Sequence, residues 1–188
     1  EKFIDLEKLI QIDNNELIGF APSAKHKTKI LPLNKFAKIG RELLTNHKRI
    51  IILFGSKDEF QYCENLRFAI GSDRCINLAG KTNLIETSLL LSKCKLIIAN
   101  DTGLMHLGDL LKVPLIAIFG STVKELGFFP SGKASFVVEN KGLNCRPCSH
   151  IGLNECPKKH FKCMNDIDES VIIKKANEIL NNNITLEE

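Results

Sequence analysis

Two hydrophobic patterns alternate along the chain, short apolar runs and stretches in which apolar residues recur every three or four positions. The first is typical of strands buried on both faces of a parallel sheet, and the second of helices that cover such a sheet. Strands are expected at 17–21, 50–54, 75–78, 96–99, 115–119 and 135–138, and helices at about 32–44, 58–70, 84–91 and 104–111. A last helix, capped by Asp166 or Asp168, is expected to reach about Leu180. This alternation predicts right-handed crossovers and a doubly wound parallel α/β sheet.

The segment from Leu96 to Gly108 is the expected centre of this fold. Its apolar strand ends in Asn-Asp-Thr-Gly, and Asp101 is expected to act as N-cap of the next helix. The free N–H groups of a helix that follows a parallel strand point into the crevice where such sheets bind ligands, and Gly103 lets a ligand approach the backbone. The turn therefore favours a phosphorylated ligand, with a simple cap as the alternative role of Asp101.

Composition supports one globular domain at 16–183, preceded by a linker or lead-in at 1–15. Of the 188 residues, 44% are hydrophobic and 26% charged, and the formal net charge is +4. No basic run interleaves with aromatics, so nucleic acid is not expected, and the local positive patch at 25–29 suits a small anion better. No transmembrane run or signal peptide is apparent, which predicts a cytoplasmic location. Because residue 1 is Glu, the chain is expected to be part of a longer one.

A cysteine-rich loop at 140–166 interrupts the alternation. It carries Cys145, Cys148, Cys156 and Cys163 with the spacing C-x2-C-x7-C-x6-C. Four thiolates can form a structural zinc site, while disulfides or a packed thiol cluster are the alternatives. We expect the four to lie together. Cys63, Cys75 and Cys94 fall in helix or strand patterns and are interpreted as core residues.

Two motifs, Asn-Asp-Thr-Gly-Leu-Met-His-Leu at 100–107 and Val-Pro-Leu-Ile-Ala-Ile-Phe-Gly-Ser-Thr at 113–122, resemble the signature of family 9 glycosyltransferases, the bacterial lipopolysaccharide heptosyltransferases. Phe-Ala-Pro-Ser-Ala at 20–24 with Lys29 and Pro32 resembles the family's first loop, and Phe-Gly-Ser at 54–56 its second. The segment 145–164 is similar to a cysteine-bearing variant of its late loop. The resemblance covers about residues 16–180.

The resemblance implies a GT-B enzyme, in which two Rossmann-like domains face each other across a cleft. This chain resembles the C-terminal domain, which in the family binds the nucleotide-sugar donor, typically ADP-heptose, and needs no cofactor for transfer. The lipid-linked saccharide acceptor and the catalytic base belong to the N-terminal domain, to which nothing here is similar. The expected function is therefore that of a donor-binding half, inactive alone, in the cytoplasm or peripheral at the inner face of the inner membrane.

The family's phosphate-contacting lysine falls on Lys29, and its donor contacts fall on Asp101, Thr102, Gly103 and His106. Weaker candidates for phosphate or nucleoside contact are Ser23, Ser121 and Thr122, and the acidic ribose contact is either Asp58 or Glu59. Without the motif, Lys29 would be interpreted as a solvated loop lysine and His106 as a helix histidine whose hydrogen bonds are satisfied within the protein. Asp101 has a further possible role as a ligand of sugar hydroxyls. The family's acidic residue and Pro after Thr122 are absent at 123–125, which leaves the contact near the base open.

Two other classes of function are compatible with the sequence. One is a GT-B transferase or epimerase that uses a UDP-sugar, because neither the fold nor a helix N-terminus selects the base. The other is a non-catalytic nucleotide-binding or metal-binding module, for which the four cysteines are the only local argument.

Overall fold

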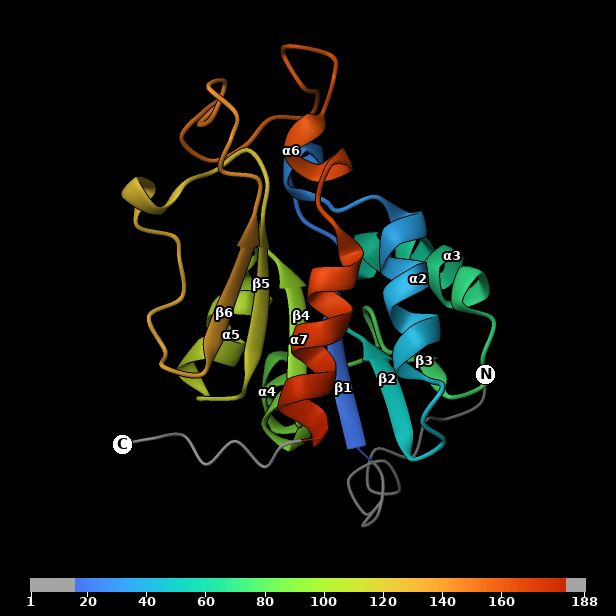
Figure 1. The fold of residues 1–188 in the computed structure, drawn as a ribbon. Helices are drawn as coiled ribbons and strands as arrows, with labels where there is room; N and C mark the ends of the chain where they lie inside the picture. Colours follow the sequence, from blue (N-terminus) through green and yellow to red (C-terminus); the bar gives the residue numbers. More distant parts are fainter. Residues whose placement is uncertain (1–15, 182–188) are drawn as a thin grey trace.

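The computed structural model describes residues 16–181, in which a six-stranded parallel sheet lies between helices on both faces (Figure 1). The strand order is β3-β2-β1-β4-β5-β6. The strands are β1 (Glu16–Ala21), β2 (Arg49–Leu53), β3 (Cys75–Asn77), β4 (Leu96–Asn100), β5 (Leu115–Phe119) and β6 (Ser135–Glu139). The predicted doubly wound sheet is thus confirmed, with strand boundaries within one residue or two of those expected from the hydrophobic runs.

The helices form two layers. On one face lie α2 (Leu33–Leu43), α3 (Phe60–Ile70) and α7 (Glu169–Asn181), and on the other α4 (Leu84–Lys93) and α5 (Gly103–Leu110) (Figure 1). Short helical segments are α6 (Lys162–Asn165) and the 3-10 turns η1 (Lys27–Lys29), η2 (Lys57–Glu59) and η3 (Lys124–Leu126). No helix within residues 16–181 is long and apolar enough to span a membrane.

The central strand β4 shows why the apolar runs lack polar alternation. Leu96 and Ile98 pack among the residues under α2, α3 and α7, whereas Ile97 and Ala99 pack under α4 and α5. All four are fully buried. Burying a side chain such as Leu or Ile stabilises the fold by about 1.5–3 kcal/mol. A polar residue on either face of this strand would therefore be costly. Cys63, Cys75 and Cys94 are buried in the same two cores, as expected.

All six strands are parallel, but the direction in which successive strands are added to the sheet reverses between β1 and β4. From β1 the chain winds outward through β2 to β3 and then returns to β4, from which it continues through β5 to β6 on the other side. The loops that follow β1 and β4 therefore diverge at the carboxyl edge of the sheet and leave a crevice between them. The predicted binding turn after β4 lies at this switch point.

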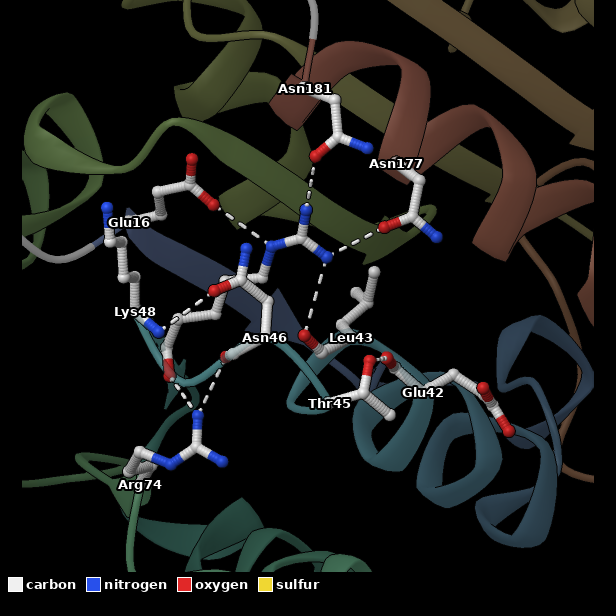
Figure 2. Close-up of polar contacts among 10 residues, drawn as sticks. Glu16, Glu42, Leu43, Thr45, Asn46, Lys48, Arg74, Asn177 and Asn181 are labelled. Atoms are coloured by element: carbon white, nitrogen blue, oxygen red, sulfur yellow. Dashed lines mark hydrogen bonds and ion pairs between the residues drawn. The ribbon is translucent and has the colours of Figure 1, made fainter.

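At the opposite, amino end of the sheet, the buried side chain of Arg49 links a strand to two helices (Figure 2). Arg49 is 2% exposed and donates to Glu16 (3.0 Å), to the Leu43 carbonyl (3.4 Å) and to the side-chain oxygens of Asn177 (2.7 Å) and Asn181 (2.9 Å). These partners belong to β1, to the end of α2 and to the end of α7. We call this group of five residues the Arg49 clasp.

Two of the expected helix starts are confirmed. Asn83 and Glu86 form the capping box of α4, and the Ser170 N–H donates to Asp168, which immediately precedes α7. The expected lead-in at 1–15 and the expected end of the domain at residue 183 lie outside the described residues.

Candidate functional site

A cavity of about 870 Å³ opens at the carboxyl edge of the sheet. Its walls come from the loops after β1, β2, β3 and β4, joined by one aromatic residue from the loop after β5. This volume is within the range of pockets that enclose small-molecule ligands and cofactors. The predicted residues Ser23, Lys29, Asp101, Thr102, Gly103 and His106 all line it.

A buried ion pair lies on the floor of this cavity. Nζ of Lys29 is 2.8 Å from Oδ2 of Asp101, and the hydroxyl of Thr122 donates to the same oxygen at 2.7 Å. The side chains of Lys29 and Asp101 are only 11% and 3% exposed. Lys29 has three N–H donors, and among the described residues Asp101 is the one hydrogen-bonding or ion-pairing partner found for them. Lys29 is therefore held in place while it keeps donors for a ligand.

The cap of α5 differs from the prediction. Thr102, not Asp101, is the N-cap, and its hydroxyl accepts from the Met105 N–H at 3.3 Å. The prediction for Asp101 was wrong because its carboxylate turns away from the helix to meet Lys29 and Thr122. Gly103 and Leu104, which come before Met105 in the first turn of α5, line the cavity. They provide the positive end of a helix dipole toward a ligand.

Gly103 leaves room for that ligand. A Cβ atom placed on Gly103 would have no neighbour within 4 Å, whereas one on Gly108 of the same helix would lie 2.6 Å from Ile97. Packing thus explains the glycine at position 108 and does not explain the one at 103. Open space beside the first turn of α5 is consistent with close approach of a phosphate to the backbone.

Asn100 fastens the two loops that carry Lys29 and Asp101. This residue is fully buried at the end of β4. Its side chain accepts from the Leu31 N–H (3.1 Å) and donates to the Pro22 carbonyl (2.7 Å). The loop after β1 is therefore held at both of its ends against β4. The sequence places Asn100 in the motif, but the partners of its amide lie 69 and 78 residues away and leave no local signal.

Ser121 and Thr122 lie behind the cavity rather than on its wall. Both are fully buried. The Ser121 hydroxyl donates to Thr28 Oγ1 at 3.0 Å, and Thr28 in turn donates to the Leu153 carbonyl at 3.0 Å. Ser121 thereby links the loop after β5, the loop after β1 and the cysteine-rich loop. Thr122 orients Asp101. The two hydroxyls thus position residues of the loops around the cavity and do not line the cavity themselves.

Of the two candidate acidic residues after Gly55, the structure places only one at the cavity. Glu59 lines the cavity, whereas Asp58 does not. One oxygen of Glu59 accepts from the Ser56 N–H at 2.7 Å, which fixes the side chain over the start of η2. The carboxylate of Glu59 is consequently the one placed at the second loop's side of the cavity.

Several lining residues were not predicted as site residues. Thr82, Asn83 and Thr87 come from the loop after β3 and the start of α4, and Phe128 comes from the loop after β5. The Phe128 ring lies 5.4 Å from Nζ of Lys29, within reach of a cation–π interaction. Their position in the sequence could have identified them as site residues, because Thr82 follows β3 at the same edge of the sheet at which Thr102 follows β4.

The loop at 140–166 brings its cysteines into one another's electrostatic influence. Burial raises the pKa of the Cys163 thiol to about 11, and the charges of Cys148, Cys156 and Cys145 add to this effect. Sγ of Cys145 lies 3.9 Å from Nε2 of His160. Within residues 16–181, no group of three or more His, Cys, Asp or Glu side chains is arranged so that it already forms a metal site.

These features define an α/β protein of the doubly wound class with a ligand cavity at its topological switch point. The family model of glycosyltransferase family 9 (heptosyltransferase) matches residues 5–159, and the chain belongs to this family. The chain is 39% identical over 182 residues to lipooligosaccharide heptosyltransferase 2 of Haemophilus ducreyi, covering 93% of this chain and 50% of that protein.

Solved structures agree in fold. The Escherichia coli ADP-heptose lipopolysaccharide heptosyltransferase II superimposes with a TM-score of 0.75 at 25% identity, covering 90% of this chain and 47% of that one. An E. coli heptosyltransferase solved with ADP gives a TM-score of 0.65 at 22% identity, covering 89% and 45%. The chain therefore spans about half the length of the relatives it matches.

Proposed function

We propose that this chain is the donor-binding half of a heptosyltransferase that moves a heptose, or a similar sugar, from an ADP-sugar to a lipopolysaccharide-core acceptor. The observation that carries the proposal is the Lys29–Asp101 pair beside the open first turn of α5, in a cavity of nucleotide-sugar size within a family 9 chain. The similarity to lipooligosaccharide heptosyltransferase 2 supports the choice of sugar and acceptor class.

Lys29 and the N–H groups of α5 would meet the diphosphate of the donor. Transfer from a nucleotide diphosphate sugar places negative charge on the departing diphosphate, and fixed cations with aligned backbone dipoles stabilise such a charge. Because Lys29 retains donors beyond its contact with Asp101, it can serve the diphosphate without losing its anchor. No divalent metal is required by this arrangement.

Glu59 and Asp101 would meet hydroxyl groups of the donor. A carboxylate accepts two vicinal hydroxyls readily, and Glu59 lines the same cavity as Lys29. Asp101 uses Oδ2 for Lys29 and Thr122, so that Oδ1 is left for a sugar hydroxyl. The lipid-linked acceptor and the catalytic base would belong to the other half of the enzyme, and this chain alone should bind donor without transferring it. In the cell the enzyme would act at the inner face of the inner membrane.

The first test is calorimetry with Lys29→Ala. A lysine–phosphate contact is charge-assisted and contributes about 1.5–3 kcal/mol, so ADP and ADP-sugar affinity should fall by about 10- to 150-fold. The matched control is Lys27→Ala, which removes an exposed lysine two residues away that does not line the cavity. Adenosine binding should be unchanged in both variants. Equal losses for ADP and adenosine would contradict the proposal, as would an affinity that depends on added Mg²⁺.

Asp101→Asn separates the two roles of that residue. If Asp101 only anchors Lys29, the asparagine frees the lysine charge, and ADP should bind as tightly as before or more tightly. If Asp101 also holds the sugar, ADP-heptose should lose affinity relative to ADP by about 5- to 10-fold, because asparagine replaces a charged hydrogen-bond acceptor with a neutral one, a difference of about 1–1.4 kcal/mol. We expect the second result. Competition between ADP and UDP on the same proteins tests the base, and tighter binding of UDP would favour a UDP-sugar enzyme instead.

A further inference from the structure

Phe128 contributes an aromatic ring to the wall of the cavity that the donor would occupy, here called the donor cavity. It comes from the loop after β5, is half-buried, and its ring centre lies 5.4 Å from Nζ of Lys29. Phe54 is the other phenylalanine along this wall, but it is 1% exposed and packs in the core under α4 and α5. Phe128 is therefore the phenyl ring whose surface is available to a ligand.

The chain around Phe128 holds the ring in place. The 3-10 turn η3 ends at Gly127, whose φ of +78° is a left-handed conformation that favours glycine. The next two residues have different surroundings. Phe128 lines the cavity, whereas the ring of Phe129 packs against the buried Phe119 with centroids 4.2 Å apart. The Phe128 ring also meets the imidazole of His150 at 5.7 Å and an interplanar angle of 67°. It is thus supported by the core and by the cysteine-rich loop.

The strand order places Phe128 at one end of the donor cavity. Lys29 and Asp101 follow β1 and β4, which are neighbours in the middle of the sheet. The loops after β2 and β3 lie on one side of this pair and carry Glu59 and Thr82, whereas the loop after β5 lies on the other side and carries Phe128. A ligand whose diphosphate lies at Lys29 can therefore extend in two directions, toward Glu59 or toward Phe128.

The two ends of the cavity differ in chemistry. One end has the carboxylate of Glu59 and the hydroxyls of Thr82 and Thr87, which can hydrogen-bond a nucleoside. The other end has the ring of Phe128 and, on the adjacent strand β4, the carboxylate of Asp101. A pyranose carries hydroxyls around its edge and C–H groups on its faces, and polarised C–H groups pack on the negative face of an aromatic ring. A carboxylate next to a phenyl ring therefore suits a sugar.

We propose that Phe128 is the surface on which the sugar of the donor stacks, beside the carboxylate of Asp101. This inference rests on the proposed function, because it takes the direction of the donor from a diphosphate at Lys29 and a ribose at Glu59. The ring contacts C–H groups that hexoses and heptoses share. Phe128 therefore favours a donor that carries a pyranose over the bare nucleoside diphosphate, and it does not distinguish a heptose from a hexose.

The test is calorimetry on the full chain with Phe128→Leu, which keeps an apolar side chain and removes the flat ring. Affinity for ADP-heptose should fall by about 3- to 10-fold, and affinity for ADP-glucose should fall equally. Affinity for ADP should change by about two-fold at most, because at 5.4 Å the Lys29 ammonium is close to the limit of about 6 Å for a cation–π contact. Phe128→Tyr retains the ring and should bind all three ligands as the wild type does.

Phe129→Leu is the matched control. It alters the adjacent phenylalanine, which packs against Phe119 and does not line the cavity. This variant should be less stable to urea, yet the ratio of its affinities for ADP-heptose and ADP should equal that of the wild type. A change in this ratio as large as that of Phe128→Leu would mean that the loop as a whole, and not the Phe128 ring, meets the sugar.

Nuclear magnetic resonance tests the contact directly. Ring protons of Phe128 should show nuclear Overhauser effects to C–H protons of the sugar in bound ADP-heptose, and these signals should be absent in Phe128→Leu. Effects to adenine protons instead would overturn the inference, because the ring would then stack on the base.

The binding data separate failure of this inference from failure of the proposed function. Equal losses for ADP and ADP-heptose in Phe128→Leu, or no loss for either, would overturn the inference and leave the donor site in place. A wild-type chain that binds UDP more tightly than ADP would contradict the proposed donor, and the same comparison of UDP with a UDP-sugar would then decide whether the ring meets the sugar. A wild-type chain that binds neither nucleotide would contradict both proposals.

Discussion

Two buried cations lie at opposite ends of the same sheet and have different surroundings. Arg49 at the amino end donates to four partners from three elements and does not line the donor cavity (Figure 2). Lys29 at the carboxyl end has one carboxylate partner and lines a cavity of about 870 Å³. The N–H groups of Arg49 are satisfied by the protein, whereas Lys29 keeps donors that are available to a ligand in the cavity.

The largest effect on stability is expected from Arg49→Ala. Removing one side of a buried charge network leaves Glu16, Asn177 and Asn181 without their donor, at a cost of about 3–5 kcal/mol. Urea unfolding measures the loss. Saturation with ADP at about 100 times its Kd should still add about 2.7 kcal/mol, as in the wild type. If folded Arg49→Ala were no longer stabilised by ADP, Arg49 would also affect ligand binding, and the contrast with Lys29 would be wrong.

A smaller effect is expected from Thr122→Val. The variant keeps the side-chain shape but removes the hydroxyl that donates to Asp101 at 2.7 Å. Because the acceptor is charged, stability should fall by about 2 kcal/mol, and ADP-heptose affinity should fall several-fold as Asp101 loses the hydroxyl group that orients its carboxylate. Thr122→Ser retains the donor and is the control. Should valine and serine behave alike in both assays, Thr122 does not position Asp101.

Gly103→Ala should separate stability from binding. A Cβ at this position meets no atom within 4 Å, so the fold should gain about 0.5–1 kcal/mol from the better helix former. ADP affinity should fall, because the methyl group occupies space beside the first turn of α5. Gly108→Ala is the contrasting variant, since its Cβ would lie 2.6 Å from Ile97 and should destabilise the fold. Tighter ADP binding by Gly103→Ala would show that the phosphate lies elsewhere.

The smallest effect concerns an ion pair that links α7 to α2. Glu169 lies 2.8 Å from both Lys35 and Lys38, and the hydrogen bonds from these lysines lower its pKa from 4.5 to about 2. A lowered carboxyl pKa contributes stability above about pH 4.5 that is lost as the pH falls toward about 2. Glu169→Gln should thus be slightly less stable than the wild type at neutral pH. Urea unfolding at several pH values should show this difference shrinking through that window, and a difference independent of pH would contradict the assignment.

The hydrophobic pattern was sufficient for the sheet because the strands are buried on both faces and carry the least ambiguous signal. The site was predictable where motif residues line the cavity themselves, as Lys29 and Gly103 do. The site was not predictable where two adjacent residues are equally suited to the same role. Asp101 and Thr102 are both good capping residues, and only the partner of the carboxylate, 72 residues earlier in the chain, shows which one caps the helix.

The same reason explains the remaining differences. Ser121 and Thr122 follow a buried strand and have residue types common in phosphate sites, yet their hydroxyls are used by Thr28 and Asp101. The choice between Asp58 and Glu59 depends on the turn of η2, which directs only Glu59 to the cavity. Long-range partners and side-chain direction are properties of the folded chain and are not encoded in local spacing.

The amide of Asn100 has a consequence for the entropy of binding. By holding Pro22 and Leu31 it closes the loop that carries Lys29 into a ring with both ends fixed before any ligand arrives. Ordering a free loop costs about 1–2 kcal/mol per residue, and a ligand that had to order this one would lose much of its affinity. The preorganised loop has already lost that freedom during folding, so more of each contact with the diphosphate of the proposed donor would be retained as binding free energy.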